Sequence, residues 1–132
     1  CLDTGALAAL IVTGDPHHRE ALEFFRDWPP GTSLTTSNLV FSETVTLLAA
    51  RYGQDEAIRF GEGFLSTRLL SAVYYADEPL ERAALTVLKR FRDKTLSFAD
   101  ATTIALVKSE KLDGVFGFDE DFPRCGIRLF PK

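Results

Sequence analysis

The sequence predicts an α/β protein with a central parallel sheet of about four or five short strands flanked by helices. Short segments rich in β-branched and aromatic residues alternate with longer amphipathic segments, which is typical of strands joined by crossover helices. The chain has 132 residues, and no repeat or linker-like stretch divides it, so we expect one domain over 1–132. An apolar fraction of 45% and a charged fraction of 26% are those of an ordinary globular protein.

The first third of the chain predicts two helices and a strand. The segment 4–11 is expected to form a short helix after an apolar entry. A second helix is predicted over 15–28, with Asp15 as its N-cap and Pro16 at its first position. The Pro-Pro-Gly sequence that follows ends this helix, and 33–36 is predicted to be a short strand.

Two further helices are predicted in the middle of the chain. The segment 37–53 begins at a capping serine and ends at Gly53, a residue type that commonly stops a helix. The segment 54–67 is also expected to be helical, although Gly61 and Gly63 lower its helix propensity.

The last part of the chain continues the alternation of strands and helices. Strands are predicted over 68–75, 114–118 and 127–130 from their aromatic and β-branched content. Amphipathic helices are predicted over 77–93 and 97–112.

Several classes of protein are disfavoured by composition. No stretch approaches the roughly 18 uninterrupted apolar residues that a membrane helix requires. No secretory signal pattern is present, so we expect a cytoplasmic protein. Cys1 and Cys125 fit no metal-binding spacing, which favours two free thiols. Because the sequence lacks methionine and begins at Cys1, we expect the natural chain to start upstream.

The charge balance leaves nucleic-acid binding open. A net charge of −4, from 15 basic and 19 acidic residues, argues against a large basic face. If four of the acids form one metal-loaded cluster, however, 15 acidic residues remain against 15 basic ones. A neutral surface around a cation-filled pocket still binds a phosphate backbone.

Glu43 interrupts an apolar stripe of the predicted helix 37–53. Projected around the helix axis at about 100° per residue, Glu43 lies between Leu39 on one side and Leu47 and Val40 on the other. A carboxylate in that position costs free energy unless a cation neutralises it. The alternative is a glutamate at the edge of the core that reaches solvent or a basic side chain.

Asp100 raises the same question in the predicted helix 97–112. It shares a stripe with Thr103, Ile104 and Val107. It also matches a capping box with Ser97, and acids favour the first turn of a helix because of the helix dipole. Taken alone, this position favours the capping role.

Asp3, Asp119 and Asp121 each have a local explanation. Aspartate caps helices and stabilises turns through hydrogen bonds from backbone N–H groups. In a parallel α/β sheet, however, the carboxyl ends of the strands form one edge, where binding sites collect. Asp3 and Asp119 both follow predicted strands, so we expect them at the same edge.

Carboxylates that converge at one edge need a counter-charge. Two unit charges about 4 Å apart repel by roughly 4 kcal/mol at an effective dielectric constant of 20. Such a cluster persists when protons or metal ions neutralise it. Oxygen ligands suit hard cations, Mg²⁺ or Mn²⁺ rather than Zn²⁺. Because Mg²⁺ held in this way also binds substrate phosphate, the cluster indicates metal-assisted phosphodiester hydrolysis.

The ordered set Asp3, Glu43, Asp100 and Asp119 resembles that of PIN-domain proteins, most closely the VapC-like ribonuclease toxins. The resemblance rests on four stretches, LDTGAL (2–7), SNLVFSETVTLL (37–48), SFADATTIALV (97–107) and FGFDEDF (116–122). It covers essentially the whole chain. It implies a compact α/β fold with a parallel sheet and an endoribonuclease site that depends on a divalent metal ion.

The resemblance also implies roles for individual residues. Asp3 and Asp100 would be the principal ligands of Mg²⁺ or Mn²⁺, Asp119 would complete the site directly or through water, and Glu43 would close its opposite wall. In the implied mechanism, water activated by the metal attacks phosphorus in line.

Two supporting residues and three partners follow from the same resemblance. Thr4 matches the hydroxyl residue after the first aspartate and is expected to orient Asp3 by a hydrogen bond. Asp121 matches a less strict second acid and is an outer candidate. In the toxin branch, the resemblance implies an RNA substrate, a homodimer and an antitoxin protein that covers the site.

Other interpretations remain open. The chain is alternatively a housekeeping RNA-processing nuclease, or a PIN-fold binding module without catalysis. A receiver-like phosphoacceptor domain fits poorly, because the first strand offers only Asp3 and Glu43 lies in mid-helix. His17 and His18 point in different directions from a predicted helix start, which favours surface or packing roles over a metal site.

Overall fold

The predicted α/β architecture with a small parallel sheet is confirmed. The computed structural model describes all residues, 1–132, and every strand pairing in it is parallel. Strand β1 (Thr35–Ser37) pairs with β2 (Ala72–Tyr74), and β3 (Val115–Phe116) pairs with β4 (Leu129–Phe130).

The N-terminal residues join these two pairs into one layer. The amide of Leu2 donates to the Thr35 carbonyl at 2.7 Å, and the amide of Phe116 donates to the Cys1 carbonyl at 2.7 Å. Leu2 also forms an isolated parallel bridge with Phe116. The order across the layer is therefore β2, β1, residues 1–3, β3 and β4, with the carboxyl ends along one edge.

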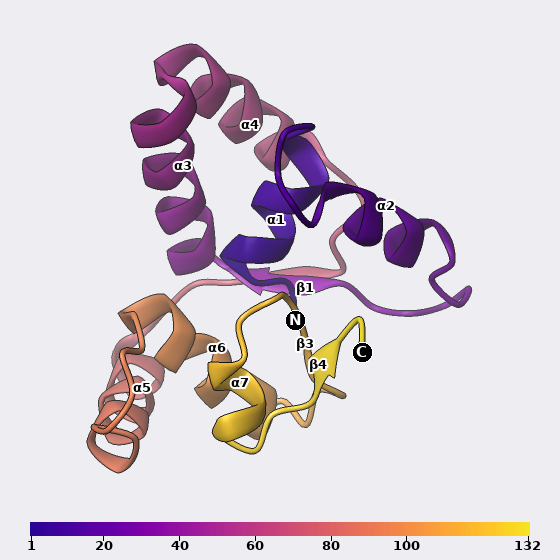
Figure 1. The fold of residues 1–132 in the computed structure, drawn as a ribbon. Helices are drawn as coiled ribbons and strands as arrows, with labels where there is room; N and C mark the ends of the chain where they lie inside the picture. Colours follow the sequence, from indigo (N-terminus) through magenta and orange to yellow (C-terminus); the bar gives the residue numbers. More distant parts are fainter.

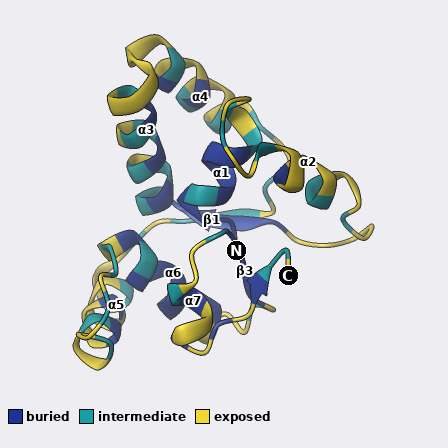
Figure 2. Cartoon of the chain, in the orientation of Figure 1, coloured by how far each residue is buried: buried dark blue, intermediate teal, exposed yellow.

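Helices cover both sides of this layer. Figure 1 shows one group of helices on one side of the layer and a second group on the other. The first group comprises α1 (Thr4–Ile11), α2 (His18–Arg26), α3 (Asn38–Tyr52) and α4 (Gln54–Ser66), and the second α5 (Glu78–Arg90), α6 (Phe98–Ser109) and α7 (Asp121–Arg124). Two apolar clusters of 12 and 11 buried residues fill these two sides, so buried positions concentrate on the strands and the inner helix faces (Figure 2).

Local signals place the helices that carry the candidate acids. Ser37 caps α3 by accepting a hydrogen bond from the amide of Val40, and Gly53 ends this helix with φ +96°. The predicted helix 54–67 forms despite its two glycines. Gly61 lies beside the Phe41 ring, where an added Cβ would make an ordinary contact at 3.8 Å, so the packing of α4 on α3 does not require glycine at this position.

The predicted start of the second helix is wrong. Helix α2 begins at His18, and the Asp15 carboxylate accepts from the amide of His17 in a turn before the helix. The helix also ends at Arg26, two residues short of the prediction, and Trp28 beyond it packs edge-on against Phe24. The Asp15 carboxylate accepts from the amide two residues along the chain, which forms a turn before the helix. Asp15 therefore does not cap the first turn of α2.

The strands are shorter than predicted, and one element was not expected. The predicted strands of four to eight residues reduce to two or three each, because only the segments opposite a paired neighbour form ladder hydrogen bonds. A four-residue helix, α7, follows β3. None of the helices combines the length and apolar content needed to cross a membrane.

Candidate active site

The four predicted acids come from four segments that meet near the carboxyl edge of the sheet. Asp3 ends the N-terminal strand segment and precedes α1, and Glu43 lies in the second turn of α3. Asp100 lies in the first turn of α6, and Asp119 follows β3. The topology therefore places side chains far apart in the sequence around one region.

Asp3 is the most buried of the four, with 4% of its surface exposed. Its Oδ2 accepts from the amide of Gly5 at 3.3 Å, whereas its buried Oδ1 has no hydrogen-bond partner. An unpaired buried carboxylate oxygen costs free energy, and such groups are rare away from functional sites.

The acids act on one another electrostatically. Burial raises the pKa of the Asp3 carboxyl from 3.8 to about 7, and the negative charges of Asp100 and Glu43 act in the same direction. Burial also raises the pKa of Asp100, with further contributions from Glu43 and Asp119. The carboxyl groups of Asp3 and Asp100 are thus harder to ionise than ordinary aspartates, because burial and neighbouring negative charges both disfavour the charged form.

Glu43 is half-buried and is held by Thr4. The Thr4 hydroxyl donates to Glu43 Oε2 at 2.6 Å, so the expectation that this hydroxyl orients Asp3 is not met. The most buried face of α3 runs through Val40, Thr44 and Leu48, which places Glu43 at the border of the core. No basic side chain forms an ion pair with it.

Asp100 caps α6, as the sequence of this position taken alone favours. Its Oδ2 accepts from the amide of Ser97 at 2.7 Å, and Ser97 Oγ accepts from the amide of Asp100 at 3.0 Å, which completes a capping box. Its Oδ1 accepts no hydrogen bond from the protein. One carboxylate oxygen thus caps α6, while its charge lies near those of Glu43 and Asp119.

Asp119 and Asp121 stabilise the turn after β3. Asp119 is exposed, and its Oδ1 accepts from the amide of Asp121 at 2.8 Å. Asp121 Oδ1 accepts from Arg124 Nη1 at 3.0 Å, so this carboxylate is paired within α7. The negative charge of Asp119 helps to raise the pKa of Asp100, whereas the carboxylate of Asp121 is paired with Arg124.

Gly117 contributes to the site and was not identified from the sequence. A Cβ at this position would stand 3.2 Å from Asp3 Cβ and 3.4 Å from Asp3 Oδ2. Only glycine gives the Asp3 carboxylate this room without displacement. The available signal was a glycine inside a predicted strand, which often marks a close approach of another group.

The residues present fit a hard divalent cation that also keeps water or substrate ligands. Their donors are carboxylate oxygens, Asp3 offers an unpartnered buried one, and none of the protein's ion pairs involves the four acids. No group of three or more Asp, Glu, His or Cys side chains encloses an ion position by itself. Mg²⁺ commonly binds through one or two carboxylates with waters and phosphate oxygens, and carboxylates of this kind match that requirement.

Replacing Thr4 by valine is expected to weaken Mn²⁺ binding about tenfold, as removal of an outer hydrogen-bond partner typically does. Valine fills the same space but leaves Glu43 Oε2 without its donor. Titration calorimetry with Mn²⁺ measures the change, and Thr4→Ser, which keeps the hydroxyl, is the control. Equal Mn²⁺ affinity in Thr4→Val and the parent protein would contradict a role of this hydrogen bond.

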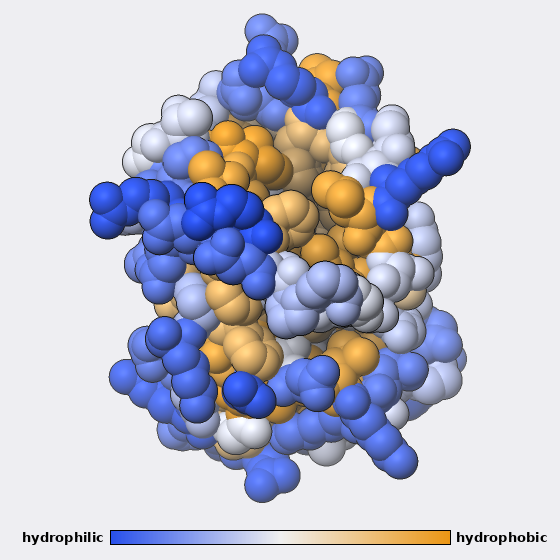
Figure 3. All heavy atoms as spheres, turned by 90° about the vertical axis from the view of Figure 1, so that its right-hand side faces the viewer, coloured by the Kyte–Doolittle hydropathy of each residue, from blue (hydrophilic) through white to orange (hydrophobic).

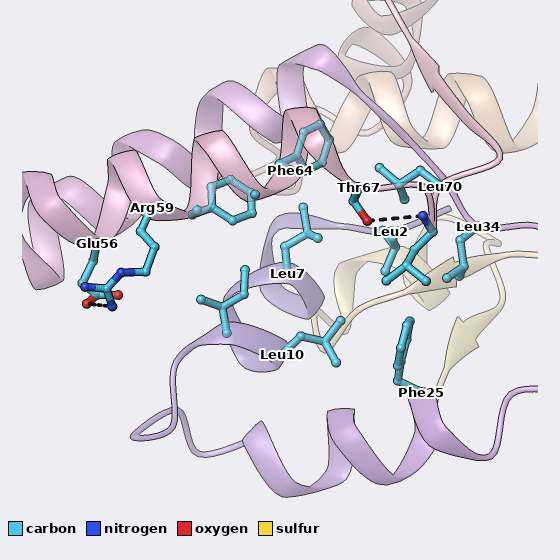
Figure 4. A pocket seen from close by; sticks show the side chains of 14 residues that line it. Leu2, Leu7, Leu10, Phe25, Leu34, Glu56, Arg59, Phe64, Thr67 and Leu70 are labelled. Carbon is cyan, nitrogen blue, oxygen red and sulfur yellow. Dashed lines mark hydrogen bonds and ion pairs between the residues drawn. The ribbon is translucent and has the colours of Figure 1, made fainter.

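A separate apolar pocket lies between α1, α4 and the start of β1. Its volume is about 340 Å³, ten of its 14 lining residues are hydrophobic, and an ion pair between Glu56 and Arg59 stands at one end (Figure 4). The face in Figure 3 shows apolar surface in a hollow between hydrophilic borders. None of the four acids lines this pocket, so it is not part of the carboxylate site.

Comparison with known proteins gives consistent matches over nearly the whole chain. Residues 1–127 match the PIN domain family. The chain is 34% identical over 126 residues to the 23S rRNA-specific endonuclease VapC20 of Mycobacterium tuberculosis, covering 96% of this chain and 93% of that protein. It is 32% identical over 124 residues to a VapC ribonuclease of Archaeoglobus fulgidus, covering 92% and 77%.

A solved structure is similar in fold as well as sequence. The crystal structure of Mycobacterium tuberculosis VapC20, described as a sarcin–ricin loop cleaving toxin, superimposes with a TM-score of 0.87 at 31% identity. The match covers 96% of this chain and 95% of that one. The arrangement of strands and helices described above is therefore shared with that toxin.

Proposed function

The chain is a VapC-like member of the PIN-domain family, and from this membership we propose that it is an endoribonuclease that uses a divalent metal ion to hydrolyse RNA phosphodiester bonds. One observation carries the proposal. The buried Asp3 has an unpartnered carboxylate oxygen near the charges of Asp100 and Glu43, and no basic side chain neutralises them.

In this proposal, Asp3 and Asp100 hold Mg²⁺ or Mn²⁺. Asp119 completes the site directly or through water, and Glu43 forms the opposite wall. Bound metal would supply Lewis-acid chemistry, assisting attack by water and neutralising charge that develops on the phosphate. The carboxylates would hold the metal ion, and the N-terminal ends of α1 and α6 add a favourable field for an anion.

Two residues support this arrangement. Thr4 orients Glu43 through its hydroxyl rather than acting on Asp3. Asp121 fixes the turn that carries Asp119, because its amide donates to the Asp119 carboxylate and its own carboxylate is paired with Arg124.

The biological role that we propose is that of the toxin in a toxin–antitoxin pair. The relatives support this role, because VapC20 is described both as a toxin and as a 23S rRNA-specific endonuclease, and the Archaeoglobus relative is a VapC ribonuclease. We therefore propose ribosomal RNA as the substrate to test first, an antitoxin protein as the natural inhibitor, and a homodimer as the assembly. A ribosomal RNA substrate would place the protein in the cytoplasm. We also propose that residues 1–132 act as one domain.

Cleavage assays with purified protein test the enzyme directly. Total bacterial RNA and a synthetic 23S sarcin–ricin hairpin are incubated with Mg²⁺, with Mn²⁺ and with EDTA, and products are separated by gel electrophoresis. We expect discrete cleavage with either metal and none in EDTA, because the acids require a counter-charge to hold phosphate.

Melting temperature provides a second measurement on the same samples. Metal that binds the folded site should raise it relative to EDTA. Absence of cleavage on every RNA, together with an unchanged melting temperature, would contradict the proposal and favour a binding module. Metal stabilisation without cleavage would support the metal site and contradict the two RNAs as substrates.

A further inference from the structure

A hollow of about 610 Å³ adjoins the segment that leads to Asp119, although none of the four acids lines it. It lies between the start of α2, the loop after β3 and the end of β4. Its volume is within the range of about 300–1,000 Å³ that small-molecule sites occupy. Its lining includes the aromatic side chains of His17 and Phe118 and the basic side chains of Arg128 and Lys132.

His17 and Phe118 form a stacked pair on the wall of this hollow. Their ring centroids are 4.2 Å apart, and the planes differ by 11°. Phe118 is half-buried, whereas His17 is exposed. The pair therefore presents a flat aromatic surface to solvent, and proteins bind unpaired nucleobases by stacking on surfaces of this kind.

The exposed imidazole of His17 forms no capping hydrogen bond within the fold. His17 occupies the N-cap position of α2 without making a side-chain capping bond, and its polar contact is a 3.6 Å approach to Glu20. The adjacent His18 differs, because its ring Nδ1 is 2.7 Å from the Ala9 carbonyl oxygen. His18 thus serves the packing of α2 on α1, whereas the His17 ring stacks on Phe118 and stays about half exposed to solvent.

The hollow and the acid cluster share a wall. Gly117 lines the hollow and also approaches Asp3, since a Cβ on it would stand 3.2 Å from Asp3 Cβ. Phe118 lines the hollow and directly precedes Asp119. The stacked rings therefore border the acid cluster on the side of Gly117 and Asp119.

Charge in the hollow is compatible with RNA. Glu20 and Glu120 line it together with Arg128 and Lys132, so its formal charges balance. The Arg128 guanidinium also lies 4.6 Å from the centre of the Phe130 ring, which holds part of this side chain against the protein. The hollow thus lacks the excess of carboxylates found at the acid cluster.

We propose that this hollow binds the nucleotide next to the scissile phosphate, with its base against the His17–Phe118 stack. The inference rests on the proposed ribonuclease function, and it adds a substrate-binding site outside the metal-binding acids. Stacking tolerates different bases, so the site would contribute affinity and position the strand.

RNA binding without cleavage tests the proposal. The Asp100→Asn background keeps the RNA intact, and fluorescence anisotropy measures the Kd for fluorescein-labelled random RNA octamers in Mg²⁺. In this background, we expect His17→Ala to weaken binding about tenfold and His17→Phe to restore it, because phenylalanine keeps the stacking surface. His18→Ala is the matched control and should leave the Kd unchanged, and melting curves check that each variant folds.

The outcomes separate this proposal from the catalytic one. A Kd that His17→Ala does not change, a failure of His17→Phe to restore binding, or no binding of octamers at all would overturn the nucleotide site. Binding that depends on His17, in a protein that cleaves no RNA in the wild-type form, would support the nucleotide site and contradict the catalytic proposal. In an active enzyme, His17→Ala should raise KM about tenfold and leave kcat nearly unchanged.

Discussion

Asp100→Asn is expected to reduce metal-dependent RNA cleavage by roughly a hundredfold or more while the protein stays folded. The substitution removes a negative charge from the candidate metal site with almost no change in shape. The asparagine Oδ1 can still accept from the amide of Ser97, the bond that Asp100 Oδ2 accepts at 2.7 Å. Activity and helix capping are therefore separable at this position.

Two control variants identify the cause of the loss. Asp77→Asn alters an exposed aspartate that caps α5 by accepting from the amide of Leu80, and it should leave cleavage unchanged. Asp100→Ala should lose activity and also about 1 kcal/mol of stability, because alanine cannot cap α6. Initial cleavage rates and thermal melts of all three variants are compared in Mg²⁺. Wild-type cleavage by Asp100→Asn would remove Asp100 from the site and leave it as a helix cap.

Without metal, the folded protein is expected to lose stability as the pH rises from about 4 to 7. The pKa of Asp3 is about 7 in the folded protein, against 3.8 for the ordinary side chain. Between these values the folded state binds more protons than the unfolded state, so the free energy of unfolding falls with increasing pH. At 1.36 kcal/mol per pKa unit, the loss over this interval is on the order of 4 kcal/mol.

Urea unfolding in EDTA at pH 4.5, 5.5 and 7 measures this loss. The raised pKa of Asp100 acts in the same direction. Mg²⁺ should reverse much of the loss at pH 7, because a bound cation favours the ionised carboxylates that burial opposes.

Asp3→Asn should flatten the pH dependence and make the metal-free protein more stable at pH 7 than the parent. The same variant should lose stabilisation by Mg²⁺ and cleavage activity, since it lacks the buried carboxylate. Asp77→Asn, at an exposed position, is again the control. Equal pH dependence in Asp3→Asn and the parent would show that burial of Asp3 does not govern stability in this range.

Several features of the site followed from the sequence because they depend on neighbouring residues. Ser37 and Gly53 set the ends of α3, and the Ser97–Asp100 pair sets the start of α6. Capping bonds join residues three positions apart, so a short stretch of sequence contains both partners. The resemblance to the PIN family added which acids to group together, and the match over residues 1–127 confirms that family.

Other features were mispredicted or missed because two segments distant in the sequence create them. Strand lengths were overestimated, since a strand ends where its parallel neighbour ends. Thr4 was assigned to Asp3, but it donates to Glu43, 39 positions away. The contacts of Gly117 with Asp3 and of His17 with Phe118 join positions about 100 residues apart.

By itself, the sequence determined the alternation of strands and helices and the caps of the principal helices, and its resemblance to the PIN family grouped the acids that we propose for the site. The tertiary structure alone decided how buried each acid is, which oxygen of Asp3 lacks a partner, and that Asp100 both caps a helix and faces other carboxylates. The physical reason is the separation along the sequence over which each interaction acts. Capping and periodicity act within a few residues, whereas burial and electrostatic coupling depend on which distant segments the folded sheet brings together.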